Sequence, residues 1–267
     1  MQARQWPATT VLVGLVVLGA AGVVAVASCE PDSAGGGDTA AVAGAAAGTG
    51  SGLEELTAEQ ILDRARQAGA GLTSLRGTVR MPEKSGTLEY SLSVGRSGDC
   101  TGTVSEGGVE AEVRRQGGTV WVKPSDAMLR LMLPDAGPEL ADKWLTGAAD
   151  LDRFSGYCDR LFGLATADGP LKPAAATGWT KSGVRQVGGT RAVFLGFRTA
   201  DGGPDSQVGT VAIADEGQPR LLSVDESGDG AVAMRFDAFD EPVAVTPPPA
   251  GLIVDASGYR FATDGSR

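Results

Sequence analysis

Hydrophobic and polar positions change their spacing several times along the chain. Residues 11–26 form an unbroken apolar run, whereas 30–52 contain almost no large apolar side chain. From Leu56 onward apolar positions recur at helical spacing, and from Leu88 onward they alternate with polar ones. This order predicts an N-terminal hydrophobic segment, a disordered linker, and a folded region that begins with a helix and continues in strands.

Four stretches of the folded region are expected to be helical. The first follows Thr57, which is spaced with Gln60 as a capping box. Two short ones cover 127–133 and 138–145, and the last is capped by Asp150. In the first helix the apolar side chains share one face, namely Ile61, Leu62, Ala65, Ala68 and Leu72.

Alternation with a period of two predicts strands in most of the remaining chain. Paired glycines such as Gly107-Gly108 and Gly117-Gly118 separate several of them. Turns this short join antiparallel strands and cannot join parallel ones, so the sequence predicts an antiparallel meander and an α+β fold. The expected strands cover 88–94, 101–105, 109–115, 119–123, 184–187, 190–197, 208–214, 220–225 and 231–237.

The N-terminal segment has the features of an export signal. Arg4 precedes the apolar run 11–26, and Val26-Ala27-Ser28-Cys29 closes the run with small residues. These four residues resemble the lipobox of bacterial lipoproteins, in which the cysteine receives a diacylglyceryl group with acyl chains such as palmitate. Two acyl chains are enough for stable membrane anchoring. A plain secretory signal with a chance cysteine and an uncleaved membrane anchor are the alternatives.

The lipobox implies a division of the 267 residues into four parts. Residues 1–28 would be the signal peptide and 29–52 the lipidated Cys29 with its tether. A folded domain is expected over 53–254, and a loose tail over 255–267. The mature protein would then lie on the outer face of the cytoplasmic membrane, as an extracytoplasmic and lipid-anchored monomer.

Charge and composition exclude several classes of function. The net charge of −10 disfavours nucleic acid, which binds basic surfaces. The chain has no histidine, and so lacks the commonest general base and zinc ligand. Ser182 beside Lys181 is the nearest approach to a catalytic dyad, but the two are neighbours in an expected turn. We therefore expect a protein without catalytic residues, metal or cofactor.

Cys100 and Cys158 are an even pair in a chain expected to be exported, which favours a disulfide. Cys158 falls on the apolar face of the last expected helix, so it points toward the core, where Cys100 on a strand can meet it. Two unpaired thiols buried as small hydrophobic groups are the alternative.

Several short motifs resemble a known family. They are Gly118–Lys123, 211–215 with 218–221, and the closing segment 236–248. Together with the lipobox, they resemble the LolA-like lipoprotein-carrier fold, in particular the LppX/LprG-type lipoproteins of actinobacteria. The resemblance covers 56–254. It implies a curved antiparallel half-barrel over helices, with an apolar cavity that holds a lipid or lipopeptide.

On this resemblance we expect a non-catalytic protein that binds or carries a hydrophobic molecule. Met128 and Met132 are one helical turn apart, and methionine adapts to ligands of irregular shape. Apolar residues of this kind are equally typical of a plain core. The alternative is a cell-surface interaction or regulatory lipoprotein whose core is filled. The candidate cavity-lining residues are Leu92, Val94, Val120, Val122, Met128, Leu131, Met132, Phe194, Val211, Ile213, Met234 and Phe236.

Overall fold

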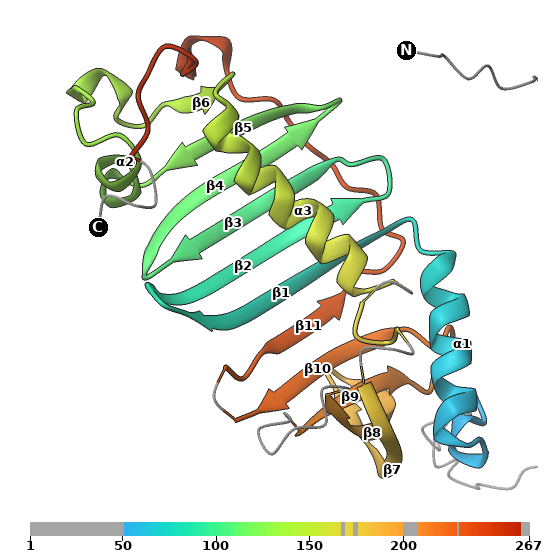
Figure 1. The fold of residues 1–267 in the computed structure, drawn as a ribbon. Coiled ribbons are helices and arrows are strands. Elements are labelled where there is room, and N and C mark those ends of the chain that lie inside the picture. Colours follow the sequence, from blue (N-terminus) through green and yellow to red (C-terminus); the bar gives the residue numbers. More distant parts are fainter. Residues whose placement is uncertain (1–50, 167–168, 173–175, 200–207, 229, 263–267) are drawn as a thin grey trace, which may run out of the picture. The chain divides into compact units, whose positions relative to one another are not determined.

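Twelve strands of the described chain form one curved, open sheet (Figure 1). The computed structural model describes residues 51–166, 169–172, 176–199, 208–228 and 230–262. The predicted signal segment, Cys29 and nearly all of the tether lie outside these residues. The strands are β1 (Ser74–Glu83), β2 (Gly86–Gly95), β3 (Cys100–Glu106), β4 (Val109–Gln116), β5 (Thr119–Pro124), β6 (Trp144–Thr146), β7 (Ala176–Val187), β8 (Thr190–Thr199), β9 (Val208–Ala214), β10 (Leu221–Ser227), β11 (Ala233–Asp237) and β12 (Ile253–Asp255).

The sheet is built from two meanders. Its order is β12-β6-β5-β4-β3-β2-β1-β11-β10-β9-β8-β7, so β1–β6 and β7–β11 each run in sequence and meet where β1 pairs with β11. All pairings are antiparallel except that of β12 with β6, which is parallel. The predicted α+β half-barrel is confirmed, with a parallel edge strand added to the expected meander.

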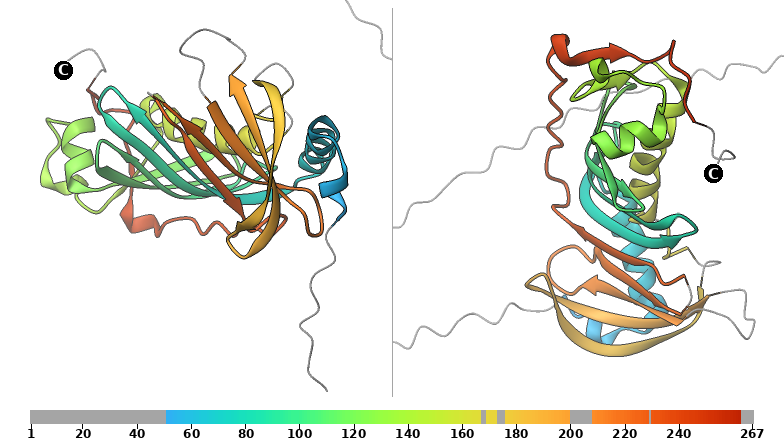
Figure 2. Two further views of the ribbon diagram at one scale, coloured as in Figure 1. Left: turned by 90° about the horizontal axis from the view of Figure 1, so that it is seen from below. Right: turned by 90° about the vertical axis from the view of Figure 1, so that its left-hand side faces the viewer.

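Helices lie on the concave side of this sheet (Figure 2). They are α1 (Ala58–Ala70), α2 (Asp126–Met132) and α3 (Asp152–Leu164). The capping box of α1 forms as predicted, because Gln60 N donates to Thr57 Oγ1 while Thr57 N donates to Gln60 Oε1. The helix expected over 138–145 is wrong in its second half, where Trp144–Thr146 extends the sheet as β6.

α3 crosses the strands of the first meander in direct contact with them. A Cβ atom on Gly77 of β1 would lie only 2.9 Å from Leu161 Cδ1 and 3.0 Å from Phe236 Cδ1. Glycine is therefore required there so that Leu161 of α3 can pack on the strand backbone. The predicted disulfide is present and joins Cys158 of α3 to Cys100 of β3.

Arg115 of β4 fixes the middle of α3 by polar contacts. Its guanidinium donates hydrogen bonds of 2.7 Å to Ser155 Oγ and to Asp159 Oδ1. It also donates to the carbonyl oxygen of Gly98. The Arg115 residue is only 8% exposed. A buried guanidinium is tolerated because its donors are paired in this way.

A second polar cluster fixes the start of the folded region. Asp215, which is completely buried, accepts hydrogen bonds from Ser51 Oγ (2.9 Å), Leu53 N (3.2 Å) and Arg191 Nε (2.9 Å). Arg191 also pairs with Glu54. The Asp215 cluster thus joins residues 51–54 to β8 and to the turn after β9.

The C-terminal part of the chain returns across the whole first meander. From β11 the segment 238–252 runs to β12 on the side of the sheet away from α3 (Figure 2). Arg114 Nη1 and Gln116 Nε2 donate to backbone oxygens of Thr246 and Val245. Within the predicted tail, Tyr259 and Phe261 pack against the main core.

Removal of the disulfide should destabilise the protein strongly. The two cysteines are 58 residues apart, and a loop of this length contributes roughly 4 kcal/mol by constraining the unfolded chain. We expect the double variant Cys100→Ser, Cys158→Ser to lose stability of this order in urea unfolding. Dithiothreitol should destabilise the wild type to the same degree and leave the variant unchanged. Equal stability of both proteins would contradict the structural role of this bond.

Asp215→Ala should cost roughly 2–3 kcal/mol, because it removes a buried carboxylate with three hydrogen-bond donors. Asp63→Ala is the matched control, since the Asp63 side chain is 59% exposed and pairs only with Arg66 on the surface of α1. That change should cost less than about 0.5 kcal/mol. Urea unfolding of both variants measures the difference, and equal losses would refute the role of the Asp215 cluster.

Candidate functional site

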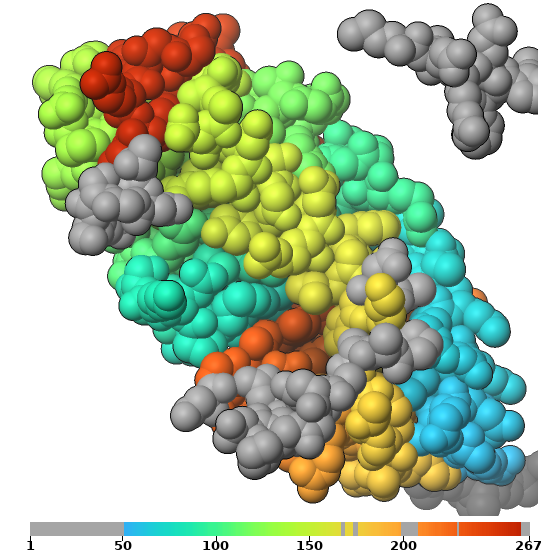
Figure 3. Space-filling view, viewed as in Figure 1, coloured from blue at the N-terminus to red at the C-terminus, as the bar shows by residue number. Residues whose placement is uncertain are grey.

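The main recess on the concave side lies beside the first half of α3. It consists of two adjoining hollows of about 350 and 1360 Å³, which share Ser85, Glu106, Gly107 and Arg153. We call this recess the α3 groove. Figure 3 shows α3 as a ridge across this side of the molecule. The other residues that line the groove are Pro82, Glu83, Lys84, Leu88, Val109, Met128, Leu131, Met132, Asp150, Tyr157, Gly230, Phe261 and Ala262.

Within the smaller hollow, α2 contributes apolar side chains to a wall that also contains Asp150 and Arg153. Ser125 Oγ accepts a hydrogen bond from Met128 N, which caps the helix and fixes its direction. Met128 and Met132 are buried, whereas Leu131 is 40% exposed, an unusual degree for a leucine in the described chain. Phe261 lines the same hollow. The three predicted cavity residues of α2 therefore share one recess.

Polar side chains of the groove join α3 to the β3–β4 turn. The hydroxyl of Tyr157 donates a hydrogen bond of 2.8 Å to Glu106 Oε1. Arg153 Nη1 lies 3.4 Å from Glu106 Oε2, and its guanidinium also lies over the ring of Phe154 at 4.7 Å. Glu106 therefore binds two side chains of α3 at once, which sets the width of the groove here.

Two tyrosine rings meet behind these polar side chains. The ring of Tyr90 from β2 lies 5.2 Å from that of Tyr157, which in turn contacts Phe154 edge to face. Burial raises the pKa of Tyr90 to about 12, because the phenolate would lose its water. The pKa of Tyr157 is raised as well, first by burial and then by its hydrogen bond to Glu106. Both hydroxyls are therefore protonated at neutral pH.

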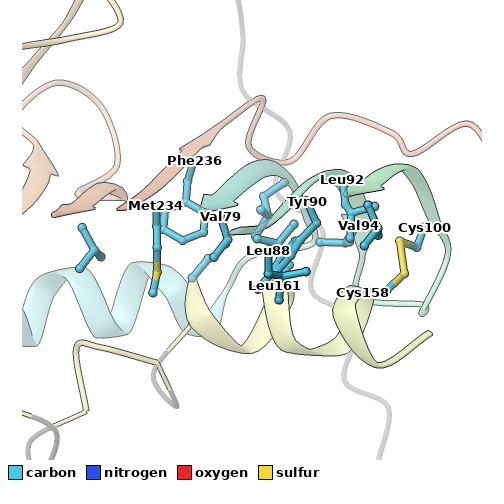
Figure 4. Close-up of a cluster of buried hydrophobic side chains, with 14 of the residues drawn as sticks. Val79, Leu88, Tyr90, Leu92, Val94, Cys100, Cys158, Leu161, Met234 and Phe236 are labelled. Atoms are coloured by element: carbon cyan, nitrogen blue, oxygen red, sulfur yellow. A yellow bond between two sulfur atoms is a disulfide. The ribbon is translucent and has the colours of Figure 1, made fainter. Parts of the chain in front are cut away.

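Most of the other candidate residues lie in the packed core. Leu92 and Val94 point from β2 toward α3, and Met234 and Phe236 lie further along the same cluster, next to Val79 (Figure 4). Val122, Val211 and Ile213 are completely buried in the same cluster, and Val120 packs against it half-buried. None of these eight lines the α3 groove in the part of the chain that the structure describes.

Phe194 lies on the opposite face of the sheet. Its register partner is Ala212, and both belong with Ala192, Ala214 and Leu222 to a small outer cluster. Arg185 covers the ring at 3.9 Å. The prediction that Phe194 lines the cavity together with Val211 and Ile213 is wrong. Phe194 pairs with Ala212, and because side chains alternate along a strand, Val211 and Ile213 point to the other face. A hollow of about 650 Å³ adjoins this outer cluster at Leu222 and Phe239.

Sequence reasoning did not single out Glu106, Arg153, Tyr157 or Tyr90 as site residues. The spacing of apolar positions puts Tyr90 on the face of Leu88 and Tyr157 on the apolar face of its helix, which indicates a direction toward the core but no role. The sequence did contain one indication. A tyrosine at a core position needs a hydrogen-bond partner for its hydroxyl, so its presence there points to a polar group nearby. Glu106 stands beside a glycine turn, where a charged residue is ordinary.

The described residues contain no helix long and apolar enough to cross a membrane. Within the same ranges no group of three or more cysteine, aspartate or glutamate side chains is placed to hold a metal ion.

Comparison with known proteins identifies the architecture. No protein-family model and no curated protein matches the chain. Among solved structures, LprF from Mycobacterium bovis is 15% identical with a TM-score of 0.52, and the match covers 72% of this chain and 96% of LprF. The chain has the fold of LprF. The resemblance to LppX/LprG-type lipoproteins is thereby confirmed at the level of the fold.

A second solved structure is that of lipoprotein LppX from Mycobacterium tuberculosis. It is 18% identical to this chain, and the match covers 71% of this chain and 98% of LppX, with a TM-score of 0.48.

The buried phenol of Tyr90 should make stability depend on alkaline pH. Its pKa is higher in the folded protein, about 12, than the value of about 10 in an unfolded chain. The folded state therefore keeps its proton between these values while the unfolded state loses it, so stability is full below pH 10 and falls as pH rises toward 12. Urea unfolding between pH 9 and 11.5 measures this slope.

Tyr90→Phe should reduce that slope, because phenylalanine has no proton to lose. Each unit of pKa difference corresponds to about 1.4 kcal/mol, so the effect is well within measurement. Tyr259→Phe is the control, since Tyr259 is the one remaining tyrosine besides Tyr157. Identical slopes for Tyr90→Phe and the wild type would show that Tyr90 ionises in the folded protein as readily as in the unfolded chain.

Proposed function

We propose that this protein binds a lipid or another amphipathic molecule in the α3 groove, without catalysis. The observation that carries the proposal is that apolar side chains of α2 and charged side chains line the same groove. Met128, Leu131 and Met132 offer hydrocarbon contact. Glu106 and Arg153, which line both hollows, offer charge and hydrogen bonds beside them. An acyl chain with a polar head needs this pairing of surfaces.

The size of the groove fits such a ligand. Its two hollows, of about 350 and 1360 Å³, are within or above the range of roughly 300–1000 Å³ typical of small-molecule sites. Each methylene removed from water contributes about 0.8 kcal/mol. An acyl chain beside α2 would also cover Leu131, which is 40% exposed.

The lipobox adds a location to this function. A diacylglyceryl group on Cys29 would hold the protein at the outer face of the cytoplasmic membrane, and residues 30–50 would be the tether. A lipid-binding domain placed there can take its ligand from the membrane or the envelope. The shared fold with LprF is consistent with this proposal, but the proposal rests on the groove itself.

A cell-surface interaction protein is the second candidate, and one observation favours it. The interior beneath α3 is filled by side chains such as Leu92, Leu161 and Phe236 (Figure 4). A hollow on the outer face presents Leu222 and Phe239 beside arginines. In this reading the groove is a surface feature, and the protein has no small-molecule ligand.

Leu131→Asp tests the proposal with a matched control. A carboxylate at this position would have to be desolvated by an acyl chain, so the amount of bound lipid should fall about tenfold. Leu252→Asp is the control, because Leu252 is equally exposed, 39% against 40%, and does not line the groove. The full chain is exported in an actinobacterial host and purified from membranes, and its extractable lipids are quantified per protein by mass spectrometry.

Two results would contradict lipid binding in the groove. If Leu131→Asp and Leu252→Asp retain lipid equally, the ligand lies elsewhere. If the wild type carries no lipid and takes up none from added envelope lipids, the interaction protein is the better interpretation.

A further inference from the structure

Tyr90 carries the one buried side-chain oxygen or nitrogen without a hydrogen-bond partner among the residues that the structure describes. Only 1% of this residue is exposed. Buried hydroxyls are nearly always paired, so an unpaired one indicates either a missing partner or a functional role. The other large polar groups near α3 are paired, including Arg115 and Tyr157.

The unpaired hydroxyl lies close behind the α3 groove. Tyr90 points from β2 toward α3, next to Leu88 and Leu161 (Figure 4). Leu88, two residues earlier on the same face of β2, lines the groove. The ring of Tyr157 also lines the groove and lies 5.2 Å from the ring of Tyr90. One layer of side chains therefore separates Tyr90 from the groove.

Tyr157 is the more exposed of the two tyrosines. It is half-buried, its ring packs against Tyr90 and Phe154, and its hydroxyl makes one hydrogen bond, to Glu106. Glu106 in turn is shared with Arg153, so Glu106 keeps a partner when Tyr157 leaves. A rotation of the Tyr157 side chain toward solvent would open a path from the groove to Tyr90.

We propose that the hydroxyl of Tyr90 donates a hydrogen bond to a carbonyl or carboxyl oxygen at the polar end of an acyl ligand, which enters from the α3 groove past Tyr157. This inference rests on the proposed function and names the chemistry that the site selects. An ester and a fatty acid both carry such an oxygen, whereas a plain hydrocarbon does not. Tyr90 is thus a specificity-determining residue.

The protonation of Tyr90 fits this role. Burial raises its pKa to about 12, so at neutral pH the group is a neutral donor and not a phenolate. Its sheet neighbours Val79 and Val104 are apolar and offer no competing side-chain acceptor. In such surroundings a hydrogen bond to a ligand replaces no existing bond within the protein.

The experiment compares ligands of equal length with and without an acceptor. Full-length wild type and Tyr90→Phe are purified in detergent and delipidated. Each is then incubated with palmitic acid, methyl palmitate or hexadecane, and native mass spectrometry and the shift in Tm measure binding. We expect Tyr90→Phe to bind methyl palmitate, palmitic acid or both about three- to tenfold more weakly. Hexadecane binding should not change, and Tyr259→Phe should behave as the wild type.

Palmitic acid and methyl palmitate distinguish the two possible sources of the acceptor oxygen. A loss confined to palmitic acid identifies a free carboxyl group, and a loss confined to methyl palmitate identifies an ester-linked lipid. If wild type and Tyr90→Phe bind all three probes equally, Tyr90 makes no hydrogen bond to the acceptor oxygen, while the proposed lipid binding stands. If the wild type binds none of them, both the inference and the proposed function fail.

Stability without ligand provides a separate test. A hydroxyl without a partner contributes no hydrogen bond, so Tyr90→Phe should be as stable as the wild type or more stable in urea unfolding at pH 7. Tyr157→Phe should be less stable, because it loses the bond to Glu106. A clear loss of stability in ligand-free Tyr90→Phe would overturn the inference, since the hydroxyl would then already have a partner.

Discussion

The attachment of α3 to the concave face determines most of what this domain can do. A disulfide fixes Cys158 to β3, and the buried guanidinium of Arg115 holds Ser155 and Asp159 from β4. Gly77 lets Leu161 reach the backbone of β1. Three different kinds of interaction thus hold one helix at three points along its length. These contacts oppose any lifting of α3 from the sheet.

With α3 in this position, the open space on the concave side lies beside the helix and not beneath it. The volume between α3 and β1–β3 is filled by side chains such as Leu92 and Val94. Open space remains beside the first half of α3, where the β1–β2 and β3–β4 turns and α2 form the facing wall. There, Glu106 and Tyr157 make the contact across the groove. A ligand that needs more room would have to break the contact between Glu106 and Tyr157, while α3 keeps its position on the sheet.

Side-chain alternation could predict the fold but not all of the faces. In β2 the pattern Leu88, Tyr90, Leu92, Val94 is clear because polar residues alternate with it, and the structure buries these residues. In β8 both faces are covered, so apolar residues follow one another and the face of Phe194 could not be read. β1 was not predicted because Gly77 interrupts its apolar positions. A glycine at this position leaves space for Leu161 of α3. The groove itself joins turns and helices far apart in sequence, and no local pattern contains it.

The groove and the Asp215 cluster lie in different meanders of the sheet. The chain enters the folded region at Ser51, where Asp215 and Arg191 hold it against β8 and β9. The groove lies at the tips of β1–β4, in the other meander. One sheet connects the two through the pairing of β1 with β11. Because one hydrogen-bonded sheet connects them, the groove is held away from Ser51, where the described chain begins. Under the proposed function, a ligand in the groove would therefore lie at the opposite end of the domain from Ser51.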